Sequence, residues 1–195
     1  MNRAQPRANE GVSVGSGTSG AAMGQRVVQV MSPGQSVAGQ GKVRASMEYE
    51  SRVKYEAARI HAASLYCSDG RVGEQFDDFL QNGLNLPRYD RVSLPGGPAC
   101  LAGHPEATLE EKGVVDELQF LVEVHKLKKV VLIAHASCAF YTTRLGLKEP
   151  RLELVQRADL VRAAAYVHRV TGLEQIEAYF TRVVEDRVKF ERVEV

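Results

Sequence analysis

The sequence predicts an α/β protein with a mainly parallel central sheet, flanking helices and an antiparallel strand at its C-terminal edge. Three observations support this class. Strand-like and helix-like segments alternate over residues 60–171, the order expected of parallel strands joined by crossover helices. The run Val130–Ala134 is continuously apolar, as in a strand that is covered on both faces. Residues 176–193 have the pattern of two strands joined by a tight turn, which adds the antiparallel edge.

The first half of the expected domain contains two helices and two strands. In order, these are a helix over 47–59, a strand over 60–66, a short helix over 73–81 and a strand over 89–94. The short helix is predicted because Phe76, Phe79 and Leu80 recur on one side. The second strand leads into the sequence Pro95-Gly96-Gly97-Pro98, which is typical of a turn.

The second half is expected to contain two longer helices and three strands. In order, these are a helix over 109–126, a strand over 130–134, a helix over 158–171, and strands over 176–184 and 188–193 joined by a turn at 185–187. The helix over 109–126 has the clearest pattern, because Val114, Leu118 and Leu121 follow the spacing of one apolar helix face. Lys128 and Lys129 follow it as cations, which are favoured at a helix C-terminus.

Composition divides the chain into a tail, residues 1–45, and a globular domain, residues 46–195. The tail holds 8 of the 17 glycines, and five basic residues against one acid give it a charge of +4. A segment with little to bury and much backbone entropy to lose is expected to be flexible. Two alternatives are an organellar transit peptide, which the scarcity of acids favours and the glycines oppose, and an arm over 27–31 that packs on a partner subunit.

Charge, hydropathy and cysteine content restrict the function. The formal net charge of +1 argues against broad electrostatic binding of nucleic acid or of an anionic membrane. No apolar run approaches the roughly 18 residues of a membrane span, so we expect no span and a cytoplasmic location, with organellar import through the tail as the alternative. Three cysteines among 195 residues do not make a disulfide framework, and an odd number fits a reducing compartment where thiols act as ligands or nucleophiles.

Two of the three cysteines follow predicted strands. Cys67 ends the first strand, and Cys138 follows the central strand with His135 three residues before it. Loops at the carboxyl ends of strands converge in an open α/β sheet, so these three residues can meet. One imidazole and two thiolates suit zinc, and three protein ligands leave a fourth position open, as in catalytic sites. A structural zinc finger would need short-spaced ligand pairs at both ends, and Cys67 has no such neighbour.

Two charged residues follow Cys67. Asp69 and Arg71 lie two and four positions further on, so an extended backbone would project all three side chains to one side. A carboxylate beside a metal-bound water can accept its proton or orient it, and a guanidinium can hold that carboxylate ionised. Two other interpretations are a surface turn and a phosphatase-type loop. The loop would need an arginine where this chain has Gly73.

The two segments resemble motifs of the beta-class carbonic anhydrases. Cys67-Ser68-Asp69-Gly70-Arg71 matches the Cys-x-Asp-x-Arg motif of that family, and His135-Ala136-Ser137-Cys138 matches its His-x-x-Cys motif. The resemblance covers residues 46–195 and implies the fold of that family. It also implies that Cys67, His135 and Cys138 bind zinc, that Asp69 and Arg71 form the catalytic dyad, and that Asp69 is a fourth ligand in a closed state. A homodimer or a dimer of dimers is implied as well, with active sites near the subunit boundary.

The sequence departs from this family in two places. Members usually have glycine after the second cysteine, where this chain has Ala139 followed by Phe140 and Tyr141, and these side chains are expected to narrow or reshape the pocket. Many members have Arg-Asn-Ala-Gly after the second strand, where residues 94–99 read Leu-Pro-Gly-Gly-Pro-Ala. The glycines still allow backbone to approach the site, but the arginine and asparagine contacts are absent.

Three hypotheses of function follow. The leading one is a lyase that uses a zinc-bound hydroxide to hydrate carbon dioxide reversibly to bicarbonate. The second keeps the metal and hydrolyses a related linear molecule, carbonyl sulfide or carbon disulfide. The third is a catalytically weak, zinc-stabilised scaffold whose basic tail recruits a partner. Cys100 and His104 have ligand-like spacing, but we expect a small buried thiol and a surface histidine.

Overall fold

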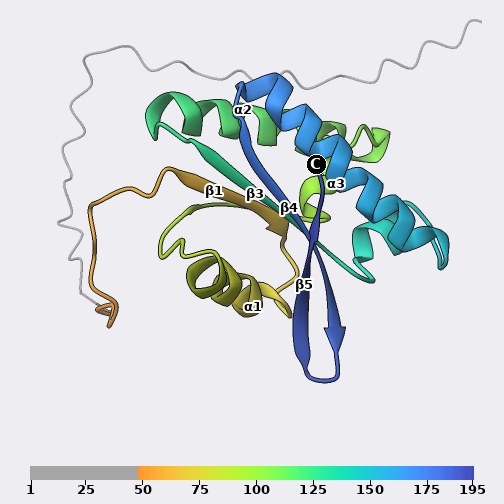
Figure 1. Cartoon of the computed structure of the whole chain (residues 1–195), viewed down its shortest axis with the longest axis horizontal. Helices are drawn as coiled ribbons and strands as arrows, with labels where there is room; N and C mark the ends of the chain where they lie inside the picture. Colours follow the sequence, from red (N-terminus) through yellow and green to blue (C-terminus); the bar gives the residue numbers. More distant parts are fainter. Residues whose placement is uncertain (1–47) are drawn as a thin grey trace, which may run out of the picture. The chain divides into compact units, whose positions relative to one another are not determined.

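The computed structural model describes residues 48–195, so the predicted tail and its possible arm lie outside the described residues. Residues 53–195 include a five-stranded sheet in the order β2-β1-β3-β4-β5 (Figure 1). The strands are β1 (Ala62–Cys67), β2 (Asp90–Leu94), β3 (Lys129–His135), β4 (Gln175–Val184) and β5 (Arg187–Val193). The first four are parallel, and β5 pairs antiparallel with β4 at the edge. The predicted fold class is therefore confirmed.

Helices cover both faces of this sheet. The main helices are α1 (Gly73–Asp78), α2 (Thr108–Val124) and α3 (Arg151–Thr171). Helices α2 and α3 lie on one face, and α1 lies on the other (Figure 1). Shorter turns complete the connections: η1 (Phe79–Gly83) continues α1, η2 (Gly97–Leu101) follows β2, η3 (Pro105–Ala107) precedes α2, and η4 (Phe140–Arg144) follows β3.

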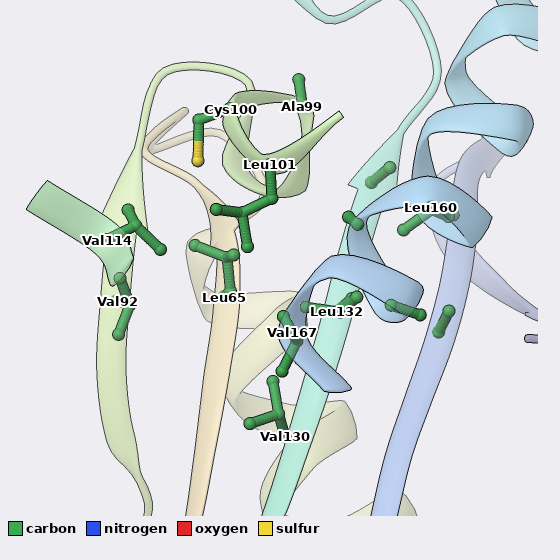
Figure 2. Packing of buried hydrophobic residues seen from close by; sticks show 14 of the residues in the cluster. Leu65, Val92, Ala99, Cys100, Leu101, Val114, Val130, Leu132, Leu160 and Val167 are labelled. Atoms are coloured by element: carbon green, nitrogen blue, oxygen red, sulfur yellow. The ribbon is translucent and has the colours of Figure 1, made fainter. Parts of the chain in front are cut away.

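The core consists of two layers separated by the sheet. Side chains alternate along each central strand, so that Leu65 and Leu132 point to the α2 and α3 layer while Tyr66 and Ile133 point to the α1 layer. Figure 2 shows the first of these layers, with Leu65 and Leu132 packed close to Val167 of α3. Every residue from 130 to 135 is buried, which confirms that the central strand is covered on both faces.

The helix predicted over 47–59 is wrong for the residues that the structure describes. Residues 48–59 contain no helix, and all of them are exposed. Tyr49 and Tyr55 expose 76% and 91% of their surface, so their side chains bury little apolar area. A short amphipathic helix is stable mainly through burial of its apolar face, and this segment lacks that burial.

Helix α3 is longer than predicted. It begins at Arg151 instead of residue 158, directly after Pro150. The early turns were missed because Gln156 lies on the buried face, where the apolar pattern would place a hydrophobic side chain. The other predicted elements are present, with ends that differ by a few residues.

The turn after β2 packs directly against the end of β1. Gly96 and Gly97 have φ values of +81° and +52°, which favour glycine. A Cβ atom on Gly97 would lie 2.6 Å from the carbonyl carbon of Tyr66 and 2.7 Å from the amide nitrogen of Cys67. Glycine is therefore required here both by conformation and by close backbone approach.

We expect Gly97→Ala to lower the free energy of unfolding by about 3 kcal/mol, since it adds backbone overlap to a left-handed conformation. The matched control is Gly103→Ala, because Gly103 has a φ of +84° but its added Cβ would meet nothing within 4 Å. That control should lower the free energy of unfolding by only about 1 kcal/mol. Urea unfolding followed by circular dichroism measures both values, and equal losses would contradict the close approach.

Candidate metal site

Three side chains meet at the carboxyl ends of β1 and β3. Cys67 is the last residue of β1, His135 is the last residue of β3, and Cys138 follows three residues later. The parallel pairing of β1 with β3 places their ends side by side. One ligand atom from each residue lies within 4.8 Å of the other two, and the Cys67 and Cys138 Sγ atoms are 3.7 Å apart. The structure thus brings together the three predicted residues, all of them buried.

The sharp turn after β3 explains how His135 and Cys138 reach the same point. Ala136 still donates its N–H to the Thr181 carbonyl of β4 over 2.8 Å, so the strand register persists to this residue. Ser137 then adopts a φ of +56°, which reverses the chain. The carbonyl of Cys138 accepts the N–H of Tyr141 over 3.0 Å, which begins η4.

The hydrogen bonds of His135 leave one ring nitrogen free for a ligand. Its Nδ1 lies 3.0 Å from the Ala136 carbonyl oxygen, and because that oxygen can only accept, Nδ1 carries the proton. The neutral ring then has its lone pair on Nε2, which is buried and has no hydrogen-bond partner among residues 48–195. A buried polar atom without a partner is costly, and coordination of a metal would satisfy it. The residues present therefore fit a metal ion.

The two thiols are in contact, and this contact moves their pKa values in opposite directions. It is the largest cause that lowers the pKa of Cys67, the backbone amides of Gly96 and Asp69 lower that pKa further, and burial opposes the shift. The same contact, together with burial, raises the pKa of Cys138. The pair therefore favours the thiolate form of Cys67, which is the form that binds metals.

Asp69 and Arg71 form a charged pair beside the three buried residues. The Arg71 Nε donates to Asp69 Oδ1 over 2.9 Å, and its Nη2 donates to Oδ2 over 2.6 Å. The Arg71 backbone N–H also donates to Oδ1 over 3.0 Å. These contacts, led by the guanidinium hydrogen bonds, hold the pKa of Asp69 well below its usual range. Asp69 is partly covered, with 18% of its side chain exposed, whereas that of Arg71 is 80% exposed.

The two aromatic side chains that follow Cys138 are part of the core. Phe140 and Tyr141 are buried in the core layer of α2 and α3, while Ala139 is exposed. A Cβ atom on Gly96 would lie 2.6 Å from the Phe140 ring, so this ring occupies the space that Gly96 leaves open. The two departures from the family motifs are therefore complementary, since the glycine after β2 accommodates the aromatic side chain after Cys138.

Cys100 and His104 do not form a ligand pair. Cys100 is fully buried in the core, as predicted, and is absent from the group of candidate ligands (Figure 2). The prediction that His104 is a surface residue is wrong, because its side chain is only 18% exposed and its Nε2 lies 2.6 Å from Asp159 Oδ2. Asp159 itself is fully buried, and no sequence motif distinguished it.

Cys100 is expected to resist alkylation in the folded protein. Burial is the main cause that raises its pKa to about 12, so the thiolate is scarce at pH 8. Treatment with iodoacetamide at pH 8 should leave the Cys100 peptide unmodified by mass spectrometry, whereas the same treatment in urea should modify it. Rapid modification without urea would contradict its burial.

The fold and the site together define an α/β protein with a buried Cys-His-Cys group at the carboxyl edge of its sheet. Residues 57–192 match the model of the family described as "Putative carbonic anhydrase", and the chain belongs to this family. This confirms the resemblance drawn from the two motifs.

Two curated relatives are uncharacterised proteins of Rickettsia. The chain is 29% identical to one from Rickettsia conorii over 106 residues, which is 50% of this chain and 56% of the relative. It is also 29% identical to one from Rickettsia bellii over 115 residues, or 52% of this chain and 69% of the relative. The match therefore spans little more than half the length of the first relative.

Several solved structures are similar at low sequence identity. The beta-carbonic anhydrase isoform I of Trichomonas vaginalis is 13% identical, with a TM-score of 0.47 over 72% of this chain and 87% of that one. A carbonic anhydrase of Streptococcus mutans is 14% identical, with a TM-score of 0.43 over 69% of this chain and 81% of that one. A carbon disulfide hydrolase is 13% identical, with a TM-score of 0.40 over 66% of this chain and 77% of that one. These scores are below 0.5, so the assignment rests on the family model.

Within residues 48–195, no helix has both the length and the apolar character needed to cross a bilayer.

Proposed function

We propose that this protein is a zinc-dependent carbonic anhydrase that converts carbon dioxide and water reversibly to bicarbonate and a proton. The observation that carries the proposal is the buried group of Cys67, His135 and Cys138, in which the Nε2 of His135 has no partner among the described residues. Membership of the carbonic anhydrase family supports the class of reaction. The charged pair of Asp69 and Arg71 beside the group supplies a candidate for proton handling.

Zinc is the metal that these donors suit best. Two thiolates and one imidazole are the ligands of a borderline-soft cation, and three protein ligands leave one tetrahedral position for water. When bound, zinc supplies Lewis acidity that lowers the pKa of a water in that position toward 7. Cys67, His135 and Cys138 are the proposed ligands. Asp69 as a fourth ligand is the alternative for a closed state, in which it would have to leave Arg71.

Asp69 is proposed to orient the attacking water and to accept its hydrogen bond. Because Arg71 lowers the pKa of Asp69, the carboxylate stays ionised at neutral pH and can act only as an acceptor. Arg71 engages both carboxylate oxygens, which fixes the plane of the group. The role of Arg71 is therefore to hold Asp69 charged and correctly oriented.

Stopped-flow measurement of carbon dioxide hydration by the zinc-loaded protein tests this function. We expect a rate above that of buffer between about pH 7 and 9, where a zinc-coordinated water ionises. Asp69 does not titrate in this range, since its pKa is lowered. The absence of any hydration rate would overturn the proposal. Release of sulfide from carbonyl sulfide or carbon disulfide, with little hydration, would instead identify the alternative substrate.

The scaffold hypothesis makes a different prediction for the same protein. A zinc-stabilised interaction protein should unfold when zinc is removed, and its biological activity should not depend on Asp69.

We further propose a homodimer or a dimer of dimers in the cytoplasm, with residues 46–195 as the folded unit. Sedimentation equilibrium of the zinc-loaded chain measures the number of subunits, and a monomer would contradict that assembly.

A further inference from the structure

Helix α3 places two polar side chains on its buried face. Gln156 and Asp159 are both fully buried and lie one helical turn apart, so they project to the same side. A buried amide or carboxylate weakens a fold unless its hydrogen bonds are made, and an apolar residue would pack there without that requirement. Their partners therefore indicate why the helix carries polar groups at these positions.

Gln156 binds the backbone of the proposed ligand His135. Its Nε2 donates to the His135 carbonyl oxygen over 2.8 Å, and this contact is buried. The Ala136 N–H of the same peptide unit donates to the Thr181 carbonyl, and the Ala136 carbonyl of the next unit accepts from the His135 ring. Gln156 thus completes the bonding of the backbone on the carboxyl side of His135.

Asp159 holds the turn that carries Cys138. One carboxylate oxygen accepts from His104 Nε2 over 2.6 Å, and the other accepts from Arg162. The ring of His104 also packs edge-on against the buried ring of Tyr141, with the ring centroids 6.2 Å apart. Tyr141 in turn donates its backbone N–H to the Cys138 carbonyl over 3.0 Å. Asp159 is therefore connected to the backbone of Cys138 through His104 and Tyr141.

We propose that Gln156 and Asp159 are positioning residues of the metal site, Gln156 through the His135 carbonyl and Asp159 through His104, Tyr141 and the Cys138 turn. This inference rests on the proposed metal site. The two contacts hold both ends of the His-x-x-Cys segment against one rigid helix of 21 residues. Groups that orient metal ligands typically change metal affinity by about 10–100-fold when they are removed.

Two variants separate this role from general packing. Gln156→Met keeps the length of the side chain but removes the donor to His135. Asp159→Asn keeps the size of the side chain but leaves only one acceptor oxygen for His104 and Arg162. The matched control is Gln119→Met, because Gln119 also donates from its side chain to a backbone carbonyl, that of Val170 over 3.4 Å, on the exposed surface.

The measurements are zinc affinity, by competition with a chelating dye, and the visible spectrum of each full-length chain at saturating Co²⁺. We expect about a tenfold or greater loss of zinc affinity in Gln156→Met and Asp159→Asn, with shifted Co²⁺ d–d bands that report altered ligand geometry. Gln119→Met should match the wild type in both. Far-UV circular dichroism confirms folding, and if Gln156→Met does not fold, Asp159→Asn decides the question alone.

The possible failures are distinguishable. Affinities within twofold of the wild type, with unchanged Co²⁺ spectra, would overturn the positioning role while leaving the metal site intact. A wild-type chain that binds neither zinc nor Co²⁺ would overturn the proposed function and this inference together. A loss of affinity in Gln119→Met equal to that in the two variants would show a general effect of stability and would also overturn the positioning role.

Discussion

Replacing Asp69 by alanine is expected to lower kcat/KM for carbon dioxide hydration by about 10²–10⁴-fold, the usual contribution of a positioned proton-handling group. The carboxylate is held ionised by Arg71 and lies two residues after the candidate ligand Cys67, so its removal eliminates the acceptor proposed to orient water. Zinc content should stay near one per chain, because the three proposed ligands remain. Stopped-flow assays and metal analysis of the same preparation measure both quantities.

The chain offers a matched control for this substitution. Asp186 also pairs with an arginine close in sequence, Arg187 at 3.6 Å, in the exposed turn of the β4–β5 hairpin. Asp186→Ala removes an equal charge and should leave kcat/KM unchanged. If Asp69→Ala hydrates carbon dioxide as fast as the wild type does, the catalytic role of Asp69 is wrong and the scaffold hypothesis gains support.

Cys67→Ser is expected to remove stoichiometric zinc. The substitution replaces a buried thiolate with a neutral hydroxyl, which is a poor zinc ligand, and it leaves two of the three proposed donors. We expect affinity to fall by more than about 100-fold, since groups that only orient ligands already account for 10–100-fold. Hydration activity should be lost with the metal.

Cys100→Ala is the control for thiol chemistry in general. Cys100 is as deeply buried as the candidate ligands, but it lies outside their group and remains protonated because burial raises its pKa to about 12. Zinc measured by mass spectrometry should therefore be unchanged in Cys100→Ala. Retention of one zinc per chain in Cys67→Ser, or its loss in Cys100→Ala, would contradict the assignment of ligands.

Several features of the fold and of the candidate site could be predicted from the sequence because they depend on local patterns. The continuous apolar run of β3 indicated a buried strand, and parallel strands necessarily bring their carboxyl ends to one edge. That rule alone places Cys67 near His135 and Cys138, although the two cysteines are 71 positions apart in the chain.

Other features depend on contacts between distant segments and could not be predicted. A glutamine that binds the backbone of His135, and an aspartate that binds His104 and Arg162, have no motif in the sequence. Gln156 also interrupts the apolar pattern at the start of α3, which is why its first turns were missed. Asp159 lies at an apolar position of the predicted helix, and this was the only signal of its role in the sequence.

The burial of Phe140 is a second case of a contact that a local pattern does not reveal. Its ring fills the space above Gly96, a residue of another loop that lies 44 positions earlier in the chain. The sequence showed both departures from the family motifs, but only their packing against each other explains why an aromatic side chain is compatible with this site. The aromatic residue then contributes to the core.

The central claim is that Cys67, His135 and Cys138 together bind one zinc ion. X-ray absorption at the zinc edge, on full-length protein loaded with one equivalent of zinc, tests it most directly because it identifies the bound atoms. We predict a four-coordinate ion with two sulfur ligands, one imidazole nitrogen and one oxygen. A spectrum with no sulfur ligand, or with four, would contradict the claim.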